Sequence, residues 1–290
     1  MATLTDNKKS QLVNVIDGGI NMDVITRETL FNRVRSWILE AGAFIRNKIN
    51  DPLTIGTKSN PKDLVTEMDR KVEFFFANKI KRYYPQHFLL SEEGYGDTLS
   101  NSLGTIWIID PIDGTMNFVH QKQHFAISIG IYEDGVGEIG FIYDVMNNNL
   151  YSAVRGNGAY KNDQKLPKLE EKVTLTKSII CLNHYWLSEN KLVDEKVMHQ
   201  LIKDVRGTRT YGSAALEFAY VAEGAVDAYI TMRLEPWDIA AGKIIVQEVG
   251  GITTNISGEK IGMLDRTSII TCNPAIQKTL LKNYLLKAKK

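Results

Sequence analysis

Apolar residues recur at helical spacing in two stretches near the start of the chain. In the first, from Thr26 to about Asn50, they lie three and four residues apart, as on one face of an amphipathic helix, and Thr26 is the candidate N-cap. The second follows Thr66 and keeps the same spacing until Pro85, where the proline ends the pattern. We therefore predict two long amphipathic helices in this part of the chain.

Short apolar runs separated by turn residues come next. The runs at 88–90 and 105–109 are both followed by acidic residues. Three further runs, at 125–132, 136–143 and 149–154, are separated by Asp-Gly and Asn-Asn-Asn sequences, which favour tight turns between antiparallel strands. The first half of the chain is thus predicted to lay two helices on a largely antiparallel sheet.

The second half alternates strand and helix patterns from about Thr176 onward, which is typical of an α/β unit. We therefore divide the chain into an N-terminal α+β lobe, 22–175, which carries most of the candidate metal ligands, and a C-terminal α/β lobe, 176–290. Both would form one catalytic unit. Residues 1–21 are polar, lack a helical period and precede Met22, so we interpret them as a disordered arm or an artificial leader.

Composition excludes several classes of partner. The 290 residues are 43% hydrophobic and 24% charged, with 35 Lys and Arg against 34 Asp and Glu, so no overall field attracts nucleic acid or an acidic membrane surface. No apolar run approaches the ~20 residues of a membrane span. Cys181 and Cys272 lie far apart within apolar runs, which favours buried, reduced thiols and a cytoplasmic protein.

The richest chemistry follows the apolar run at 105–109. Asp110 and Asp113 flank a proline, and Gly114 and Thr115 come next. A carboxylate near the core must be paired or must bind a cation, and the rigid proline would let a backbone carbonyl turn toward that cation too. Backbone N–H groups at the start of the following helix would offer an anion site. The stretch therefore predicts a metal beside a phosphate.

Three more acidic residues stand at the ends of predicted elements, namely Asp69, Glu92 and Asp238. Each alone is weak evidence, because an Asp at a helix start is usually an N-cap and a Glu after a strand is usually solvated. Together with Asp110 and Asp113 they describe an oxygen-rich site that suits Mg²⁺. No cluster of His and Cys argues for zinc.

Five motifs, in order along the chain, resemble those of the inositol monophosphatase family, whose members are Mg²⁺-dependent, lithium-sensitive phosphatases. The resemblance covers about Thr26 to Tyr284. It implies an αβαβα layered sandwich, the sugar phosphatase fold, which mixes α+β and α/β features and agrees with the element order above. The motifs are Asp63 to Asp69, Glu92-Glu93, Trp107 to Thr115 with Asn117-Phe118, Gly212 to Ala215, and Trp237 to Gly242.

The resemblance also implies roles for individual residues and two to three Mg²⁺ ions. Glu92, Asp110 and the carbonyl of Ile112 would hold the first ion. Asp110, Asp113 and Asp238 would hold the second, and Glu92 would help a weaker third through water. The implied catalytic residues are Asp69, Thr115 and Glu92, with the Asp69 and Thr115 pair orienting and deprotonating the attacking water.

The substrate would be held by several further groups. The amides of Gly114 and Thr115 would cradle the phosphate, and Lys58 is the candidate loop lysine, with a plain surface lysine as the alternative. The start of the helix at Gly212, Ser213 and Ala214 would border the substrate hydroxyls, although small residues there also permit close packing.

Substrate choice is where the resemblance loosens. Where the animal inositol enzymes carry a glutamate this chain has Thr231, followed by Arg233 and Glu235, a change that favours substrates with more negative charge. The leading prediction is hydrolysis of inositol monophosphate and other small sugar or nucleotide phosphates. The alternatives are an NADP(H) 2′-phosphatase or a fructose-1,6-bisphosphatase of the same family. Nothing specifically supports a nucleotide 3′-phosphatase.

Two broader predictions concern partners. A non-enzymatic, regulatory or RNA-associated role is disfavoured, because a disused site should not keep all of these carboxylates, and near-zero net charge weakens RNA binding. The resemblance suggests a homodimer, with the apolar strands of 125–160 as a candidate isologous interface. We therefore expect a small phosphate ester as the ligand and neither nucleic acid nor a membrane as a partner.

Overall fold

The structure, a computed structural model, describes residues 22–52, 54–57, 64–99 and 101–290. Both long helices are confirmed, as α1 (Val24–Lys48) and α2 (Glu67–Tyr83). Helix α1 begins earlier than predicted, because the side chain of Asp23, and not that of Thr26, is the N-cap and accepts a hydrogen bond from Thr26 N at 3.0 Å. Thr66, the residue before α2, is the N-cap of that helix.

The predicted strands of the first half form one seven-stranded sheet in the order of the chain. β3 and β4 run parallel and every later neighbour is antiparallel, so the predicted meander is confirmed. β4 is longer than predicted, since it continues through both carboxylates to Asp113. The strands are β3 (Phe88–Ser91), β4 (Thr105–Asp113), β5 (Ala126–Glu133), β6 (Val136–Asp144), β7 (Asn149–Val154), β8 (Gly158–Lys161) and β9 (Gln164–Lys165).

A second, five-stranded sheet has the order β11-β10-β12-β14-β13. β10 pairs in parallel with β11 and β12, whereas β14 is antiparallel to both of its neighbours. The short strand β13 was not predicted, because three residues after a Gly-Gly pair are too few to show a period. Its strands are β10 (Ile179–Leu182), β11 (Gly207–Arg209), β12 (Ala228–Leu234), β13 (Ile252–Thr254) and β14 (Thr267–Cys272).

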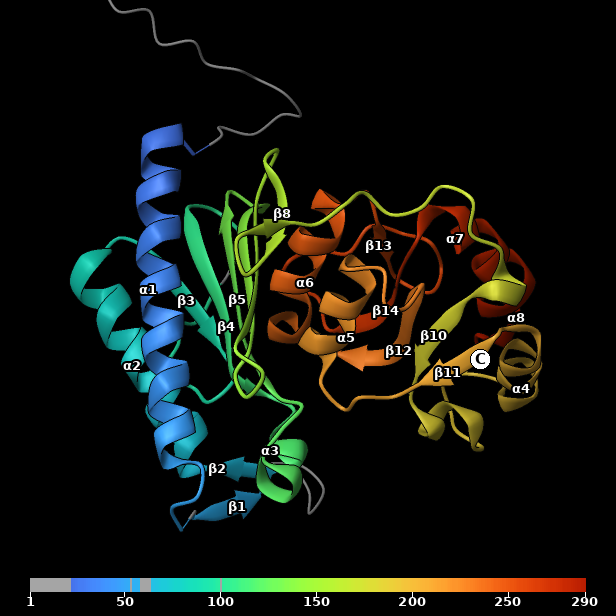
Figure 1. Cartoon of the computed structure of the whole chain (residues 1–290), viewed down its shortest axis with the longest axis horizontal. Helices are drawn as coiled ribbons and strands as arrows, with labels where there is room; N and C mark the ends of the chain where they lie inside the picture. Colours follow the sequence, from blue (N-terminus) through green and yellow to red (C-terminus); the bar gives the residue numbers. More distant parts are fainter. Residues whose placement is uncertain (1–21, 53, 58–63, 100) are drawn as a thin grey trace, which may run out of the picture.

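Helices cover both sheets in five layers, as Figure 1 shows. α1 and α2 pack on the outer face of the seven-stranded sheet, and the middle helices lie between the sheets. The remaining helices pack on the far side of the five-stranded sheet. The predicted αβαβα sandwich is therefore confirmed. These helices are α5 (Ala214–Ala222) and α6 (Pro236–Glu248) in the middle, and α4 (Glu195–Asp204), α7 (Pro274–Leu280) and α8 (Leu286–Ala288) outside.

Several short elements complete the chain. A two-stranded ribbon, β1 (Ile55–Thr57) with β2 (Leu64–Thr66), precedes α2, and α3 (Thr115–Gln121) follows β4. Two 3-10 turns, η1 (Leu175–Lys177) and η2 (His184–Leu187), flank β10. Near the end of the chain a π-helical segment, η3 (Leu281–Leu285), lies between α7 and α8. The proposed division near residue 175 falls between the two sheets and stays a prediction.

The middle layer is packed very closely where α5 crosses α6. A Cβ atom placed on Gly242 of α6 would lie 2.2 Å from Cγ of Phe218 on α5, far inside van der Waals contact. The same helix approaches the seven-stranded sheet at Gly130, where a Cβ atom would lie 2.8 Å from that of Ala240. Glycine at these two positions therefore lets the layers approach to backbone contact.

The strands proposed as a dimer interface have their apolar side chains buried within the chain. Ile127 and Ile129 point into the cluster beneath α1 and α2, and Ala126 and Ile142 into the cluster around α5 and α6. Helices of the same chain therefore cover these side chains, and the candidate interface within 125–160 stays a prediction. The homodimer itself stays a prediction.

Two other expectations can be compared with the fold. Cys181 and Cys272 are buried free thiols, which confirms the reduced pair. Over the residues that the structure describes, none of the helices has both the length and the apolar surface needed to cross a membrane.

Candidate active site

Three carboxylates from different elements meet at one point. Asp110 and Asp113 lie on β4, and Asp238 is the third residue of α6. Oxygen atoms of all three lie within 4.8 Å of one another. Residues three apart in a regular strand face opposite sides, but the pairing of β4 with β5 shifts register between Asp110 and Asp113. This irregularity lets both side chains face the same cluster.

The cluster concentrates negative charge away from water. Asp110 and Asp113 are buried, and within the described ranges no Lys or Arg forms an ion pair with any of the three carboxylates. Burial raises the pKa of Asp110 well above its ordinary value, and the nearby Glu92, Asp113 and Asp238 raise it further. Burial does the same to the pKa of Asp238. Such a group of like charges is stable only with a proton or a cation.

The donor set fits a divalent cation. Carboxylate oxygens are the ligands that Mg²⁺ and Ca²⁺ prefer, and no His or Cys belongs to the cluster. Glu92 lies beside it and shares a hydrogen bond with Asp110. Glu92 follows β3, the parallel neighbour of β4, which explains why the two carboxylates meet.

Backbone and hydroxyl donors orient each carboxylate. Ile112 N donates to Asp110 Oδ1 at 3.0 Å, and Glu235 N donates to Asp238 Oδ2 at 2.8 Å. Asp113 Oδ2 accepts from Ala215 N at 2.7 Å and also from the hydroxyl of Ser213. Such second contacts fix the direction in which a ligand oxygen points. The three side chains are therefore held in fixed orientations by these contacts.

A hydroxyl and a carboxylate are paired beside the cluster. Thr115 Oγ1, at the start of α3, lies 3.1 Å from Asp69 Oδ1 and 3.1 Å from the carbonyl oxygen of Ile112. Asp69 is fully buried in a capping box with Thr66 at the start of α2. Burial raises the pKa of Asp69 to about 6, while hydrogen bonds from Thr66 oppose that rise. The structure thus brings together the two residues predicted to act on water.

The segment before α5 is held against the start of α3. Gly114 has a left-handed backbone (φ 91°), and a Cβ atom there would lie 3.1 Å from the carbonyl oxygen of Gly212. The peptide groups of Tyr211 are held from both sides: Tyr211 N donates to Glu217 at 2.7 Å, and its carbonyl accepts from Asn117 at 2.6 Å. The buried Glu217 was not predicted, because one acidic residue in a helix gives no distinctive signal.

A cavity of about 660 Å³ opens over the carboxylates. Its walls include Asp113 and Asp238 together with five of the predicted substrate residues, Gly212, Ser213, Ala214, Thr231 and Arg233. Glu235 is not part of its lining, since this side chain forms an ion pair with Arg266 at 2.8 Å. Lys58 lies outside the described residues.

Sequence reasoning missed one wall of this cavity. Asn183, His184, Tyr185 and Trp186 line it from the turn that follows β10. No motif points to them, because their role depends on the parallel pairing of β10 with β12, which carries Thr231. Two parallel neighbours place the residues after their ends on one edge of the sheet.

The chain belongs to the inositol monophosphatase family, whose model matches residues 27–288. It is 53% identical to the inositol-1-monophosphatase of Bacillus subtilis (strain 168) over 251 residues, 87% of this chain and 94% of that protein. It is also 33% identical to the Nus factor SuhB of Escherichia coli (strain K12), over 84% of this chain and 91% of that protein.

Solved structures of inositol monophosphatases are similar to this chain in both sequence and fold. A staphylococcal inositol monophosphatase, SaIMPase-II bound to 2′AMP, is 41% identical, with a TM-score of 0.82, 89% of this chain covered and 95% of that one. An IMPase/NADP phosphatase complexed with Mg²⁺ and phosphate is 28% identical, with a TM-score of 0.83, 91% of this chain covered and 99% of that one.

Proposed function

We propose that the chain is a Mg²⁺-dependent phosphomonoesterase that hydrolyses inositol monophosphate and other small phosphate esters with an activated water. The observation that carries this proposal is the cluster of Asp110, Asp113 and Asp238, which has no cationic partner in the described chain and lies beside the Thr115 and Asp69 pair. Family membership and a solved relative complexed with Mg²⁺ and phosphate support it.

The proposed ligands form two sets. Glu92, Asp110 and the carbonyl of Ile112 would hold one ion, and Asp110, Asp113 and Asp238 a second, with a third ion near Glu92. When bound, Mg²⁺ would neutralise charge on the phosphate and make a water more acidic. The count of two to three ions is part of the proposal.

The residues of the chain would supply the proton path. An ionised Asp69 accepts the hydrogen of the Thr115 hydroxyl, which turns a lone pair of Thr115 Oγ1 toward the cluster. That lone pair can orient a water. As the water attacks phosphorus and the P–O ester bond breaks, the water's proton passes to Thr115 Oγ1, the hydroxyl proton of Thr115 moves to Asp69, and the released alkoxide takes a proton from solvent. The amides at Gly114 and Thr115 would face the phosphate oxygens.

A second candidate, a 2′-phosphatase acting on NADP(H) or related nucleotides, is favoured by one specific observation. A relative that is 41% identical binds 2′AMP. In this chain Thr231 and Arg233, and no carboxylate of β12, line the cavity, so a nucleotide phosphate meets less negative charge there. The fructose-1,6-bisphosphatase alternative is supported only by the added positive charge of Arg233.

One relative carries a name that does not describe a phosphatase, the Nus factor SuhB. What favours an enzyme is the geometry described above: the carboxylates and the hydroxyl pair are all present and brought together. An RNA partner would instead require a basic surface, and the chain has a net charge of +1.

The testing experiment measures phosphate release from inositol 1-phosphate with Mg²⁺, with EDTA, and with Li⁺ titrated in. We expect release that requires Mg²⁺, is inhibited by Li⁺, and is abolished in Asp113→Asn. The amide oxygen of that variant can still accept from Ser213 and Ala215, so circular dichroism should show a folded protein. Asp163→Asn, an exposed position, is the matched control. Mg²⁺-dependent turnover by Asp113→Asn at the wild-type rate would refute the metal assignment.

Cellular location and oligomeric state rest on weaker observations. The free, buried thiols of Cys181 and Cys272 suit a reducing compartment, so we propose the cytoplasm. The homodimer is suggested by the family resemblance, and light scattering on a size-exclusion column would test it.

A further inference from the structure

We propose that Arg233 forms a second anion-binding subsite, which binds a phosphate group of the substrate other than the one that is hydrolysed. This inference rests on the proposed phosphatase function and adds to it a preference among substrates. Phosphomonoesters that carry a second phosphate group would be favoured over those with only one.

The position of Arg233 is the first observation. The cavity over the carboxylates and a neighbouring cavity of about 430 Å³ share Tyr185, Trp186 and Arg233 in their linings. Arg233 therefore stands where the two spaces meet. A substrate whose reacting phosphate lies at Asp113 and Asp238 can extend past the aromatic pair toward Arg233.

The charge of Arg233 is the second observation. Its side chain is exposed, and across the described residues it forms no ion pair. The nearest carboxylate along β12 and its following residues, that of Glu235, is already paired with Arg266. A guanidinium group can hold a phosphate through two parallel hydrogen bonds, which makes an unpaired Arg at a cavity wall a good phosphate ligand.

The remaining charges of the second cavity nearly cancel. Lys191 and Glu189 both line it, one of each sign. Arg233 therefore gives the lining of the second cavity its net positive charge, and it also lines the first cavity. In that cavity, Asp113 and Asp238 would face the metal ions of the proposed site.

The wall next to Arg233 is held in place. Trp186 is only 5% exposed, and its indole N–H donates to the hydroxyl of Thr231 at 3.2 Å. Tyr185 packs edge-on against Trp186 at 4.9 Å, and the guanidinium carbon of Arg233 lies 6.0 Å from the centre of the Trp186 ring. Thr231 therefore supports the wall through Trp186.

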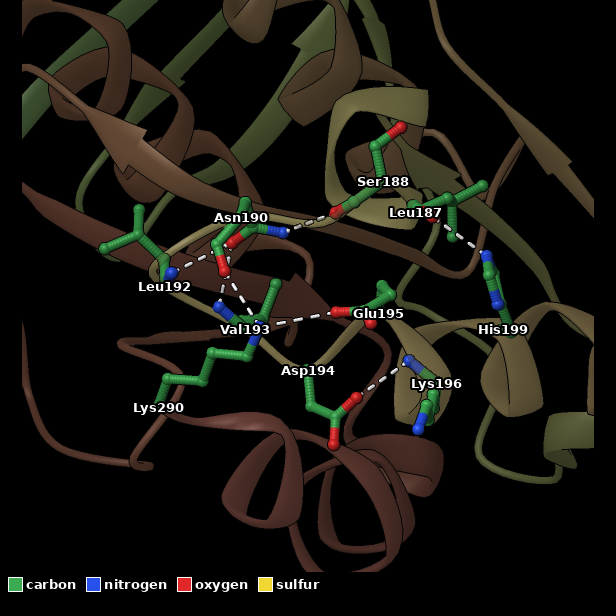
Figure 2. A network of polar contacts seen from close by, with 10 residues as sticks. All are labelled: Leu187, Ser188, Asn190, Leu192, Val193, Asp194, Glu195, Lys196, His199 and Lys290. Atoms are coloured by element: carbon green, nitrogen blue, oxygen red, sulfur yellow. Dashed lines mark hydrogen bonds and ion pairs between the residues drawn. The ribbon is translucent and has the colours of Figure 1, made fainter.

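The far side of the second cavity is held by a network that Figure 2 shows. The side-chain oxygen of Asn190 accepts from Leu192 N and Val193 N, both at 2.9 Å, and its side-chain nitrogen donates to the carbonyl of Ser188 at 2.9 Å. Lys290 Nζ donates to the carbonyl of Asn190 at 2.8 Å. A subsite built from such fixed walls loses little entropy when a ligand enters.

The test compares two substrates that differ by one phosphate, 2′-AMP and adenosine 2′,5′-bisphosphate. The quantity measured is the ratio of their kcat/KM values, bisphosphate over monophosphate, with inositol 1-phosphate assayed in parallel. We expect Arg233→Ala to lower this ratio at least about tenfold, the loss expected for one charge-assisted contact. Arg233→Lys keeps the charge but loses the planar pair of N–H donors. Its ratio should therefore lie between those of the wild type and Arg233→Ala.

Arg82→Ala is the control, because it removes an exposed arginine about 20 Å along α2 from Asp69 and should leave the ratio unchanged. An unchanged ratio in Arg233→Ala, or an equal fall for both substrates, would overturn the subsite. Failure of the wild-type protein to hydrolyse even inositol 1-phosphate would instead overturn the phosphatase function on which the subsite rests.

Discussion

The hydroxyl of Ser213 donates a hydrogen bond to the carboxylate of Asp113, 100 positions earlier in the chain. The same hydroxyl caps α5, where it accepts from Leu216 N at 3.3 Å. One side chain thus joins the end of β4 to the start of a helix in the middle layer. Ser213 was predicted to border the substrate, and the structure gives it this additional contact with a candidate metal ligand.

Replacing Ser213 by Ala should weaken both structure and metal binding. The lost cap should lower the free energy of unfolding by about 1 kcal/mol. Loss of the contact to Asp113 should weaken Mg²⁺ affinity by about tenfold or more, because partners of metal ligands typically have effects of that size. Urea unfolding with EDTA measures the first effect, and a Mg²⁺ titration of activity measures the second.

Asp194→Ala is the matched control for this prediction, since Asp194 caps α4 through Lys196 N at 2.9 Å and lies in the outer layer. It should lose similar stability and no Mg²⁺ affinity. Equal Mg²⁺ affinity in Ser213→Ala and wild type would show that the contact to Asp113 is not functional.

Activity should fall in acid as Asp69 takes up a proton. Burial raises the pKa of Asp69 to about 6, so below that pH the side chain is already protonated and cannot take the proton that Thr115 passes on. We expect kcat/KM to drop about tenfold per pH unit below that point. Thr66→Val removes a hydrogen bond that stabilises the charged form of Asp69, so the acid limb should move to higher pH.

A pH–rate profile between about pH 4.5 and 8 at saturating Mg²⁺ measures this shift. Thr26→Val provides the control, because Thr26 makes the same kind of hydroxyl contact to Asp23 at the exposed start of α1. An acid limb that stays in place in Thr66→Val would argue against Asp69 as the proton acceptor.

The buried Glu217 should lower the free energy of unfolding at neutral and higher pH. Burial raises its pKa from 4.5 to about 7, so the folded state resists the ionisation that the unfolded chain undergoes around pH 4.5. The penalty is absent below pH 4.5 and complete above pH 7. Glu217→Gln keeps an acceptor for Tyr211 N and should therefore raise the free energy of unfolding at pH 8, by up to about 3 kcal/mol.

The same substitution should have a much smaller effect near pH 4.5, where wild-type Glu217 is neutral in the folded state and only half ionised in the unfolded chain. Urea unfolding curves at both pH values, recorded with EDTA, make the comparison. A loss of stability at pH 8 would mean that the ionised carboxylate is needed to hold the Tyr211 segment.

Gly242→Ala should disrupt the crossing of α5 and α6. Its new methyl group would lie 2.2 Å from Cγ of Phe218, in a core that has no room to move, so we expect a loss of about 1–3 kcal/mol. Thermal unfolding measures the loss. Gly207→Ala, whose new atom would lie 3.7 Å from Arg209, is the control and should unfold near the wild-type temperature.

Local patterns were sufficient to predict the elements that form the site. The apolar run at 105–109 is followed directly by two carboxylates, a proline and a glycine. The strand, the carboxylates and the start of α3 could therefore be predicted from adjacent residues. The order of alternating elements was likewise enough for the layered sandwich. Where the signal was short, as in β13, it failed.

Contacts between distant segments could not be predicted from spacing. Three such contacts depend on how the two sheets and the middle helices pack. They are the hydrogen bond from Ser213 to Asp113, the hydrogen bond from Tyr211 N to Glu217, and the cavity wall around Trp186. An apolar strand likewise gives no indication of which helix will cover it, as the buried side chains of β5 and β6 illustrate.

The residues proposed for hydrolysis and those proposed for substrate selectivity lie on different structural elements. Asp238 and Gly242 sit within two turns of α6, between the sheets, so changes there disturb both packing and chemistry. The turn after β10 and the exposed end of β12 carry Tyr185 and Arg233 outside that tightly packed layer. We expect substrate preference to be open to divergence and to engineering at these rim positions, while the hydrolytic centre tolerates little change.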